Sequence, residues 1–410
     1  MKVALLVPSW PPGYSPNGIV TYASQLVPAL RRLGHEVFVL TMSGDGCDRQ
    51  VVNTGQFAMS PTLWDRAAYL LMPNRAAFKA GADRITAAAR YLVAHHGVEV
   101  LEIEDTFGWG YGVARLKALP VVVRLHGPWF LNGRFEGRQG PNASDLRRQA
   151  REGRGIANAH FVTSPSVEVL QSVQEHYGYR LHARRVIPNP FAAAPASERW
   201  DPETAEQDTL LFVGRSDSRK GGDVVLRVFA ELASTYPRLR LTFVGPDRGV
   251  AAPDGSTWSL DRYFKSVVPY PYQSRVDFRG QIDHAAIATL RRSHFITIIA
   301  SRYEIMPYSV LEAMSVGCPM AVTSVGGIPE IIRDHSNGLV VPSDDVRAMA
   351  EACRTLLDDR ALAARLGQQA WRDCRDLYAP DRIAEQTVAV YREAIHAFRS
   401  RRQSGRRLRR

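Results

Sequence analysis

The chain contains one pattern twice: short apolar segments of strand length alternate with segments of helical pattern, and a proline-rich stretch separates the two runs. In the first run the expected strands cover residues 2–8, 36–41, 98–103, 121–125 and 159–163, with a helix at 20–33. Strands that alternate with helices form a parallel sheet with helices on both faces. The first half of the chain therefore predicts an α/β domain.

The second run follows a linker that contains Pro188, Pro190, Pro195 and Pro202. Its expected strands are 209–213, 240–244, 276–278, 295–299, 320–323 and 339–341, and its expected helices are 223–236, 284–293, 346–357, 360–377 and 380–399. A chain of 410 residues is too long for one ordinary core. We predict two α/β domains, 1–190 and 209–378, whose parallel sheets face across a ligand-binding cleft. Residues 191–208 form the linker, 379–398 a C-terminal helix and 399–410 a basic tail.

Composition excludes several other classes of protein. With 45% hydrophobic and 23% charged residues, the chain has the balance of a folded globular protein. Its longest apolar runs have strand length, and none reaches the ~18–20 residues of a membrane span. The N-terminal apolar run ends in prolines after about five residues, which is too short for a signal peptide. Cys47, Cys318, Cys353 and Cys374 lack metal-binding spacing and are interpreted as reduced thiols of a cytoplasmic protein.

Positive charge is concentrated at the C-terminal end. Residues 399–410 hold seven arginines and no acid, so the rest of the chain carries +4 of the net charge of +11. We interpret this tail as a solvated, disordered end. The alternative is peripheral contact with an anionic membrane, where each basic residue contributes about 1 kcal/mol. Nucleic-acid binding is not expected, because no aromatic interleaving or nucleic-acid module accompanies the charge.

The segment 301–330 contains the most informative polar pair. Glu304 and Glu312 flank a loop that turns into a helix at about residues 307–309, and Gly317 is the expected helix stop. The free N–H groups of a helix N-terminus favour an anion, whereas carboxylates favour sugar hydroxyls. A ligand that carries both phosphate and hydroxyls satisfies this combination, and a nucleotide-sugar is such a ligand. A surface pair of acids and a glycosidase pair are the alternatives, and a positioning role for Glu312 fits better than hydrolysis.

Other candidate residues lie at expected strand ends. Arg215 and Lys220 follow the first strand of the second half and suit a diphosphate leaving group, or form a solvated turn. His126 ends a strand, where an imidazole either touches a substrate or has only a structural role. Gly18 precedes a helix and either lets a ligand approach the backbone or is an ordinary loop glycine. No GxGxxG motif is present, which argues against a dinucleotide site.

Two further segments have open interpretations. Residues 61–96 mix aromatic, aliphatic and basic side chains, which fits a membrane-surface segment or, more often, a helical pair that covers the sheet. Residues 133–155 hold six arginines and three acids, which fits the binding of a phosphorylated acceptor or a solvated loop.

Together these motifs resemble the retaining glycosyltransferases of family 4, which have the GT-B fold of two Rossmann-like domains. The likeness covers nearly the whole chain: the Gly18 loop, Gly34-His-Glu-Val37, His126, Pro188-Asn189, Arg215 with Lys220, and the paired glutamates followed by Gly326-Gly327 and Pro329-Glu330. The chain departs from the family at Asn17-Gly18, where two glycines are usual. It also departs at Pro307, which stands where glycine is common and removes one backbone donor.

The resemblance implies a role for each candidate residue. Arg215 and Lys220 would hold the donor diphosphate, and Gly18 would border it. Glu312 would bind the ribose, and Glu304 would lie by the donor sugar. His126 would bind that sugar and stabilise the transition state. The N–H groups of Met306, Tyr308, Ser309 and Val310 would stabilise the leaving phosphate, and Ile282 would lie near the base.

The family likeness also implies the reaction. We expect a retaining, metal-independent hexosyltransferase that uses a nucleoside-diphosphate sugar, UDP or GDP, and no other cofactor. The acceptor is expected to be a glycan or a lipid-linked molecule in polysaccharide or glycolipid synthesis, at the inner face of the plasma membrane. The final helix is expected to cross back onto the first domain. The alternatives are a sugar-nucleotide epimerase or hydrolase on the same scaffold, and a non-catalytic sugar-nucleotide-binding protein.

Overall fold

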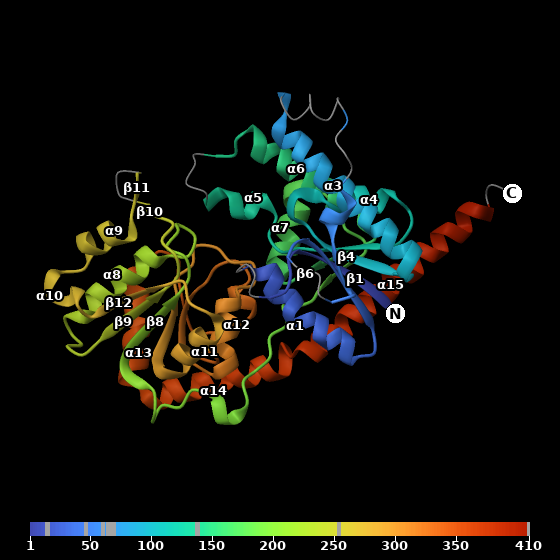
Figure 1. Cartoon of the computed structure of the whole chain (residues 1–410). Coiled ribbons are helices and arrows are strands. Elements are labelled where there is room, and N and C mark those ends of the chain that lie inside the picture. The colour runs from blue at the N-terminus through green and yellow to red at the C-terminus, as the bar shows by residue number, and fades with distance from the viewer. Residues whose placement is uncertain are drawn as a thin grey trace. The chain divides into compact units, whose positions relative to one another are not determined.

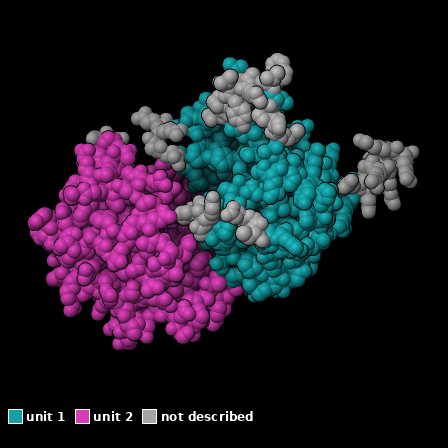
Figure 2. All heavy atoms as spheres, viewed as in Figure 1, with its two compact units in different colours: residues 1–133, 140–190, 380–410 teal, residues 134–139, 191–379 magenta. Residues whose placement is uncertain are grey.

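The computed structural model describes residues 1–12, 17–44, 48–58, 62, 71–135, 140–251 and 256–407, with the backbone alone for 73–75, 251 and 402–407. The chain divides into two compact units, coloured separately in Figure 2. Unit 1 consists of residues 1–133, 140–190 and 380–410, and unit 2 of residues 134–139 and 191–379. The residues predicted as a linker, 191–208, thus belong to unit 2.

Unit 1 contains a parallel seven-stranded sheet with the order β3-β2-β1-β4-β5-β6-β7. Its strands are β1 (Lys2–Ser9), β2 (Glu36–Ser43), β3 (Val51–Asn53), β4 (Val100–Glu104), β5 (Val121–Arg124), β6 (Phe161–Ser164) and β7 (Arg184–Val186). The central strands are apolar along nearly their whole length because helices cover both faces of such a sheet. The chain order reverses between β1 and β4, and ligands bind parallel sheets at such switch points.

Several helices accompany this sheet in Figure 1. They are α1 (Gly18–Arg32), α3 (Pro73–Tyr91), α4 (Gly110–Arg115), α5 (Trp129–Asn132), α6 (Ala143–Ala157), α7 (Val167–Tyr177) and α15 (Pro380–Arg407), with the short turns η1 (Thr54–Phe57), η2 (Leu92–His96), η3 (Thr106–Gly108) and η4 (Gly133–Phe135). Asn17 begins α1, because its side-chain oxygen accepts the N–H of Ile19 at 2.8 Å.

A buried polar network joins α15 to the sheet of unit 1. The carboxylate of Glu102 on β4 accepts the hydroxyl of Tyr22 at 2.8 Å and that of Tyr391 at 2.9 Å. Arg124 lies over the Tyr22 ring and donates to Asn189 at 2.8 Å. The final helix thus belongs to unit 1, as the family resemblance implies, and Asn189 has a structural partner.

Unit 2 repeats the architecture with a parallel six-stranded sheet of the order β12-β9-β8-β13-β14-β15. Its strands are β8 (Glu206–Val213), β9 (Arg240–Val244), β12 (Val276–Gly280), β13 (His294–Ile299), β14 (Met320–Thr323) and β15 (Leu339–Val341), beside a small antiparallel pair of β10 (Val250–Ala251) and β11 (Thr257–Trp258). Here the chain order reverses between β8 and β13, which makes this pair the switch point of unit 2.

Helices on both sides complete the core of unit 2. They are α8 (Gly222–Ala233), α9 (Leu260–Val267), α10 (Tyr270–Gln273), α11 (His284–Ser293), α12 (Tyr308–Val316), α13 (Val346–Asp358) and α14 (Arg360–Leu377), with the turns η5 (Ala196–Glu198) and η6 (Ile328–Glu330). The crossovers through α8 and α12 leave the β8–β13 pair in opposite directions, so right-handed connections place these helices on opposite faces. Buried aromatic rings such as Phe212, Phe243 and Phe295 fill the core between them.

The secondary structure differs from the sequence prediction at a few places. The short edge strands β3 and β7 were not predicted, and the residues 399–407 continue α15 instead of forming a disordered tail. Cys318, Cys353 and Cys374 are buried free thiols, and Cys47 lies outside the described residues. Among the described residues, no helix is both long enough and apolar enough to span a membrane.

Candidate functional site

Loops from three neighbouring strands of unit 2 meet at the switch point. The loop after β8 carries Lys220, the loop after β13 carries Glu304, and the loop after β14 carries Gly326 and Gly327. All three loops leave the carboxyl ends of parallel strands, so they lie at one edge of the sheet. The structure therefore brings together residues that are far apart in the sequence.

Glu304 lies at the centre of this cluster and is 4% exposed. Its Oε1 atom accepts hydrogen bonds from Lys220 Nζ at 2.5 Å and from the Ser301 hydroxyl at 2.8 Å. Arg219 Nη1 lies 3.6 Å from Oε2. Burial acts to raise the pKa of the Glu304 carboxyl, but Lys220 and Arg219 outweigh it, and the net pKa lies below its usual value. Glu304 is therefore an anion at neutral pH.

The backbone around Lys220 depends on a glycine. Gly221 has φ +71°, and a Cβ atom there would lie 1.9 Å from the carbonyl oxygen of Ala300. This close approach joins the β8 loop to the β13 loop. Arg302 strengthens the junction, because its guanidinium pairs with both carboxylate oxygens of Asp223 at 2.9 and 2.7 Å. Arg219 and Arg302 were not predicted as site residues, whereas Ser301 begins the segment that was.

Arg215 has a different partner from Lys220. Its guanidinium lies 2.7 Å from Asp217, and half of the side chain is exposed. The structure thus brings Lys220 to Glu304 and leaves Arg215 at the exposed side of the β8 loop.

The loop after β14 also touches Glu304. Gly326 has φ +51°, and a Cβ atom there would lie 1.8 Å from the Glu304 carbonyl oxygen. That oxygen accepts the N–H of Gly327 at 3.0 Å. The close approach of the backbones therefore requires glycine at position 326, whereas Gly327 contributes its N–H.

The N-terminus of α12 follows Glu304, as the sequence predicts, and Gly317 ends the helix with φ +73°. Met306 and Val310 are buried, whereas Tyr308 and Ser309 are half-buried. The N–H of Val310 donates to the Pro307 carbonyl at 3.2 Å, so it already has an acceptor. The Tyr308 ring packs near Phe191, with 6.1 Å between the ring centroids. Ser309, in the first turn, has the position from which an N–H can bind an anion.

Glu312 lies one turn inside α12 and has its own cation. The fully buried Arg291 of α11 donates to Glu312 Oε2 at 2.9 Å, and His284 Nδ1 lies 3.9 Å from Oε1. Ile282, half-buried, lies in the loop between β12 and α11. The two glutamates are thus held by separate groups of basic residues. From the sequence, Arg291 is only a basic residue on a predicted helix, and this position does not indicate that its partner is Glu312.

Unit 1 places His126 just after β5, at the carboxyl edge of its sheet. The backbone N–H of His126 donates to Asp105 Oδ1 at 2.7 Å, and its ring meets the Tyr22 ring edge-on at 4.9 Å. Burial and the neighbouring Arg124 lower the pKa of His126 well below its usual value. The imidazole is therefore neutral at pH 7 and can both donate and accept a hydrogen bond.

Asp105, beside His126, was missed by the sequence analysis. It is 2% exposed, and its Oδ2 atom has no hydrogen-bond partner among the described residues. Burial and Glu152 raise the pKa of Asp105 to about 7, and burial and Asp105 raise that of Glu104 to about 8. The carboxyl end of β4 thus holds two acids that bind protons near neutral pH. Their position after an apolar strand was the available signal.

Gly18 is the exposed first residue of α1, at the β1 side of the switch point of unit 1. Asn17, where the family usually has a glycine, provides the helix cap described above. In the part of the chain that the structure describes, no group of three or more acidic, histidine or cysteine side chains is placed to hold a metal ion.

Comparison with known proteins identifies two family models that together cover most of the chain. Glycosyltransferase Family 4 matches residues 16–193, and Glycosyl transferases group 1 matches residues 197–373.

Two relatives illustrate the range of the match. D-inositol 3-phosphate glycosyltransferase of Streptomyces avermitilis is 32% identical over 203 residues, which are 48% of this chain and 42% of that protein. The match thus spans less than half the length of that relative. Glycogen synthase of Mycobacterium tuberculosis is 25% identical over 424 residues, which cover 95% of this chain and 94% of that protein.

A solved structure with a similar fold is that of HepE from Anabaena in complex with UDP-glucose. It has a TM-score of 0.68 and 16% sequence identity, and it covers 96% of this chain and 100% of that one. At this identity the likeness concerns the fold alone.

Proposed function

The chain belongs to glycosyltransferase family 4 and has the GT-B fold, and from this premise we propose that it is a retaining enzyme that needs no metal. It moves a hexose from a nucleoside-diphosphate sugar to a hydroxyl group of a glycan or lipid-linked acceptor, in polysaccharide or glycolipid synthesis. The observation that carries this proposal is the cluster of Lys220, Arg219 and Glu304 beside the N-terminus of α12, at the switch point of unit 2.

The cluster suits the departure of a nucleoside diphosphate. In the proposed reaction the bond between the sugar C1 and the phosphate oxygen breaks, and a bond from C1 to the acceptor oxygen forms. The acceptor proton passes to an oxygen of the leaving phosphate on the same face, which retains the configuration. Negative charge grows on the phosphate, and Lys220, Arg219 and the first turn of α12 stabilise it. Arg215, half-exposed on the same loop, binds the outer part of the diphosphate.

The two glutamates have different tasks in this proposal. Glu304 remains ionised because its cations lower the pKa of its carboxyl, so it opposes the positive charge that develops on the sugar ring. Glu312 is held by Arg291 on one oxygen and accepts ribose hydroxyls with the other. Ile282 contacts the base.

Unit 1 contributes His126 to the donor sugar. Because its imidazole is neutral, it offers a hydrogen bond without adding a positive charge near an oxocarbenium-like sugar. The acceptor binds at the carboxyl edge of the same sheet, and Gly18 borders the donor diphosphate.

Product analysis with EDTA tests this function. The enzyme is incubated with UDP- and GDP-hexoses, with and without a mixture of glycan and lipid-linked acceptors, and proton NMR records the anomeric configuration of the product. We expect acceptor-dependent transfer with retention that EDTA does not change. Release of free sugar at the same rate without acceptor would instead support the hydrolase, an altered sugar nucleotide the epimerase, and absence of turnover with measurable binding the non-catalytic alternative.

Peripheral contact with an anionic membrane is part of the proposal and rests on the seven arginines at 399–410. Truncation after Phe398 tests it by cosedimentation with vesicles that contain anionic lipid. We expect the truncated protein to lose most of its vesicle binding, and unchanged binding would exclude the role of this segment.

A further inference from the structure

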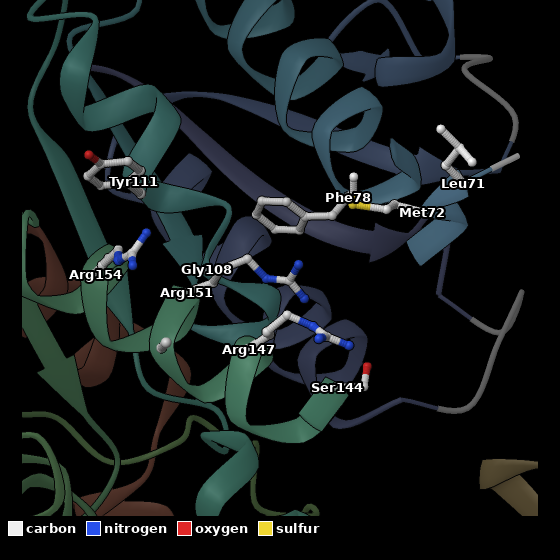
Figure 3. A pocket seen from close by; sticks show the side chains of 10 residues that line it. Leu71, Met72, Phe78, Gly108, Tyr111, Ser144, Arg147, Arg151 and Arg154 are labelled. Atoms are coloured by element: carbon white, nitrogen blue, oxygen red, sulfur yellow. The ribbon is translucent and has the colours of Figure 1, made fainter. Parts of the chain in front are cut away.

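Unit 1 contains a cavity of about 720 Å³ that the donor chemistry does not use. Its walls come from α3, η3, α4 and α6, and Figure 3 shows it from close by. The volume lies in the range of ~300–1,000 Å³ that small-molecule sites occupy. Its lining combines apolar surface with the side chains of three arginines. This lining suits a ligand that has both an apolar part and a negative charge.

The three arginines lie on one face of α6. Arg147, Arg151 and Arg154 are spaced by four and three residues, so their side chains project from the same side of the helix into the cavity (Figure 3). Within the described residues, none of the three forms an ion pair with a carboxylate. The neighbouring Arg148 does so, because it binds Glu152 at 2.8 Å. Among the described residues, the positive charge of these three side chains thus has no ion-pair partner within the cavity.

Arg151 is held in place by an aromatic ring. Its guanidinium lies 4.0 Å from the ring centroid of Phe78, which itself stacks on Trp109 at 4.9 Å. The Nε atom of Arg151 is buried and has no hydrogen-bond partner among the described residues. A buried donor without an acceptor is costly, and an anion bound beside this side chain would supply one.

The same cavity exposes apolar side chains. Leu71 and Met72, which precede α3, are 77% and 51% exposed, and Phe78 forms part of the same wall. Large apolar side chains gathered in one hollow are typical of a binding surface. Covering them with an apolar ligand removes this surface from water and stabilises the complex.

The cavity adjoins the edge of the sheet at which His126 lies. Gly108 in η3 lines it with φ +74°, and a Cβ atom there would lie 2.3 Å from the Arg151 carbonyl oxygen. Shortly before Gly108 in the chain, Asp105 accepts the N–H of His126. The cavity is thus connected through a single turn to the carboxyl end of β4.

We propose that this cavity binds the acceptor, and that the acceptor is a phosphate-bearing lipid with a free hydroxyl that receives the sugar: an apolar chain packs on Leu71, Met72 and Phe78 while its phosphate binds Arg147, Arg151 and Arg154. Arginine binds phosphate through paired, charge-assisted hydrogen bonds, whereas a free anion would gain nothing from the apolar wall. This inference rests on the proposed function, because it names the class of acceptor for that reaction.

Calorimetric titration with dodecyl phosphate below its micellar concentration tests the proposal. The variant is Arg147→Gln/Arg154→Gln, since both side chains are exposed and their loss should leave the fold intact. Its matched control is Arg90→Gln, an exposed arginine near the other end of α3. We expect the double variant to bind at least about tenfold more weakly, which is ~1.4 kcal/mol. The control should bind as the unaltered protein does.

Two further ligands define what is recognised. Dodecyl phosphocholine keeps the chain, but a choline cation offsets the single charge of its phosphodiester, and inorganic phosphate lacks the chain. We expect both to bind at least about tenfold more weakly than dodecyl phosphate. Equal binding of the zwitterion, equal binding of inorganic phosphate, no binding of dodecyl phosphate, or an unaffected double variant would each overturn the proposal.

Titration of the unaltered protein with UDP and GDP separates this inference from the proposed function. Nucleotide binding without dodecyl phosphate binding rejects the lipid-phosphate acceptor alone. Dodecyl phosphate binding without any nucleotide binding rejects the transferase function and shows that the cavity serves another purpose.

Discussion

Replacing Lys220 by methionine should destabilise unit 2 through the buried carboxylate that it leaves behind. Lys220 Nζ lies 2.5 Å from Glu304, which is 4% exposed. Removing one partner of a buried ion pair costs about 3–5 kcal/mol. The Ser301 hydroxyl and Arg219, 3.6 Å away, still serve the carboxylate, so we expect a loss of about 2–3 kcal/mol. For a unit of this size that corresponds to a fall in Tm of about 4–12 °C.

The loss should depend on pH in a direction that can be worked out. In the unaltered protein the folded-state pKa of Glu304 is lowered, so its contribution is present above the unfolded-state pKa and disappears as the pH falls through the folded value. Without Lys220, less positive charge opposes the effect of burial, and the pKa of Glu304 in the folded variant is higher. The variant should therefore be more destabilised at pH 8 than at pH 4.

Scanning calorimetry of a double-mutant cycle measures this coupling. The cycle combines Lys220→Met with Glu304→Gln, and the control is Lys265→Met, which removes an exposed ion pair on α9 worth at most about 0.5 kcal/mol. We expect a coupling energy of about 1–2 kcal/mol between the two sites. Additivity within ~0.5 kcal/mol, or a Lys220→Met variant as stable as the control, would refute the reasoning.

Three further changes test other parts of the structure. Burial and Asp105 raise the pKa of Glu104 to about 8, so the folded chain keeps a proton that the unfolded chain releases, and the free energy of unfolding should fall from pH 5 to pH 8. Glu104→Gln should flatten this dependence on pH in urea titrations. An unchanged dependence would contradict the raised pKa of Glu104. Tyr391→Phe removes one of two hydroxyls that donate to a buried carboxylate of β4 and should cost about 1–3 kcal/mol in the same titrations, whereas a neutral result would exclude that network as a support of α15. Gly326→Ala places a Cβ atom 1.8 Å from a carbonyl oxygen, so it should lower both Tm and turnover much more than Gly280→Ala, which has a similar φ but open space; equal effects would remove the steric argument.

The sequence predicts the fold well where an apolar run or a helical spacing is uninterrupted. The bounds of α11, α14, β14 and β15 agree with the predicted segments, because continuous apolar runs and helical spacing mark buried elements. The strands β3 and β7 are only three residues long and lie at the sheet edges. β15 is equally short and also lies at a sheet edge, but its residues are all apolar, whereas β3 ends in Asn53 and β7 begins with two arginines. A mixed segment of three residues gives no periodicity, so its pairing depends on tertiary contacts that a single sequence does not reveal.

The acidic residues of the candidate site were easier to predict from the sequence than the basic residues that bind them. Glu304 and the start of α12 follow from a strand, a loop and a helix signal in one short segment. Arg219 and Arg291 reach their glutamates across the fold from other elements, and an arginine on a loop or helix does not reveal its partner. Arg215 was predicted from its position after a strand, which suits a ligand. In the structure its guanidinium lies beside the carboxylate of Asp217.

The positions of Lys220, Glu304 and His126 after strands were predictable because they depend on topology. In each unit the chain order reverses once, and in unit 2 the loops at that place carry Lys220 and Glu304. Asp105 was not predicted, because its carboxyl becomes unusual only through its burial in the fold beside Glu152 of α6. Burial of this kind depends on elements that are distant in sequence.

The measurement that tests the central claim most directly is calorimetric titration of UDP, GDP and ADP, in the presence of EDTA, into the unaltered protein, Lys220→Ala and Lys265→Ala. The account predicts that one nucleoside diphosphate binds without metal and that Lys220→Ala weakens it at least about tenfold, as expected for the loss of a charge-assisted hydrogen bond of about 1.5–3 kcal/mol. Lys265→Ala should bind as the unaltered protein does. Absence of binding by all three nucleotides, or equal binding by the two lysine variants, would contradict the donor site at the switch point of unit 2.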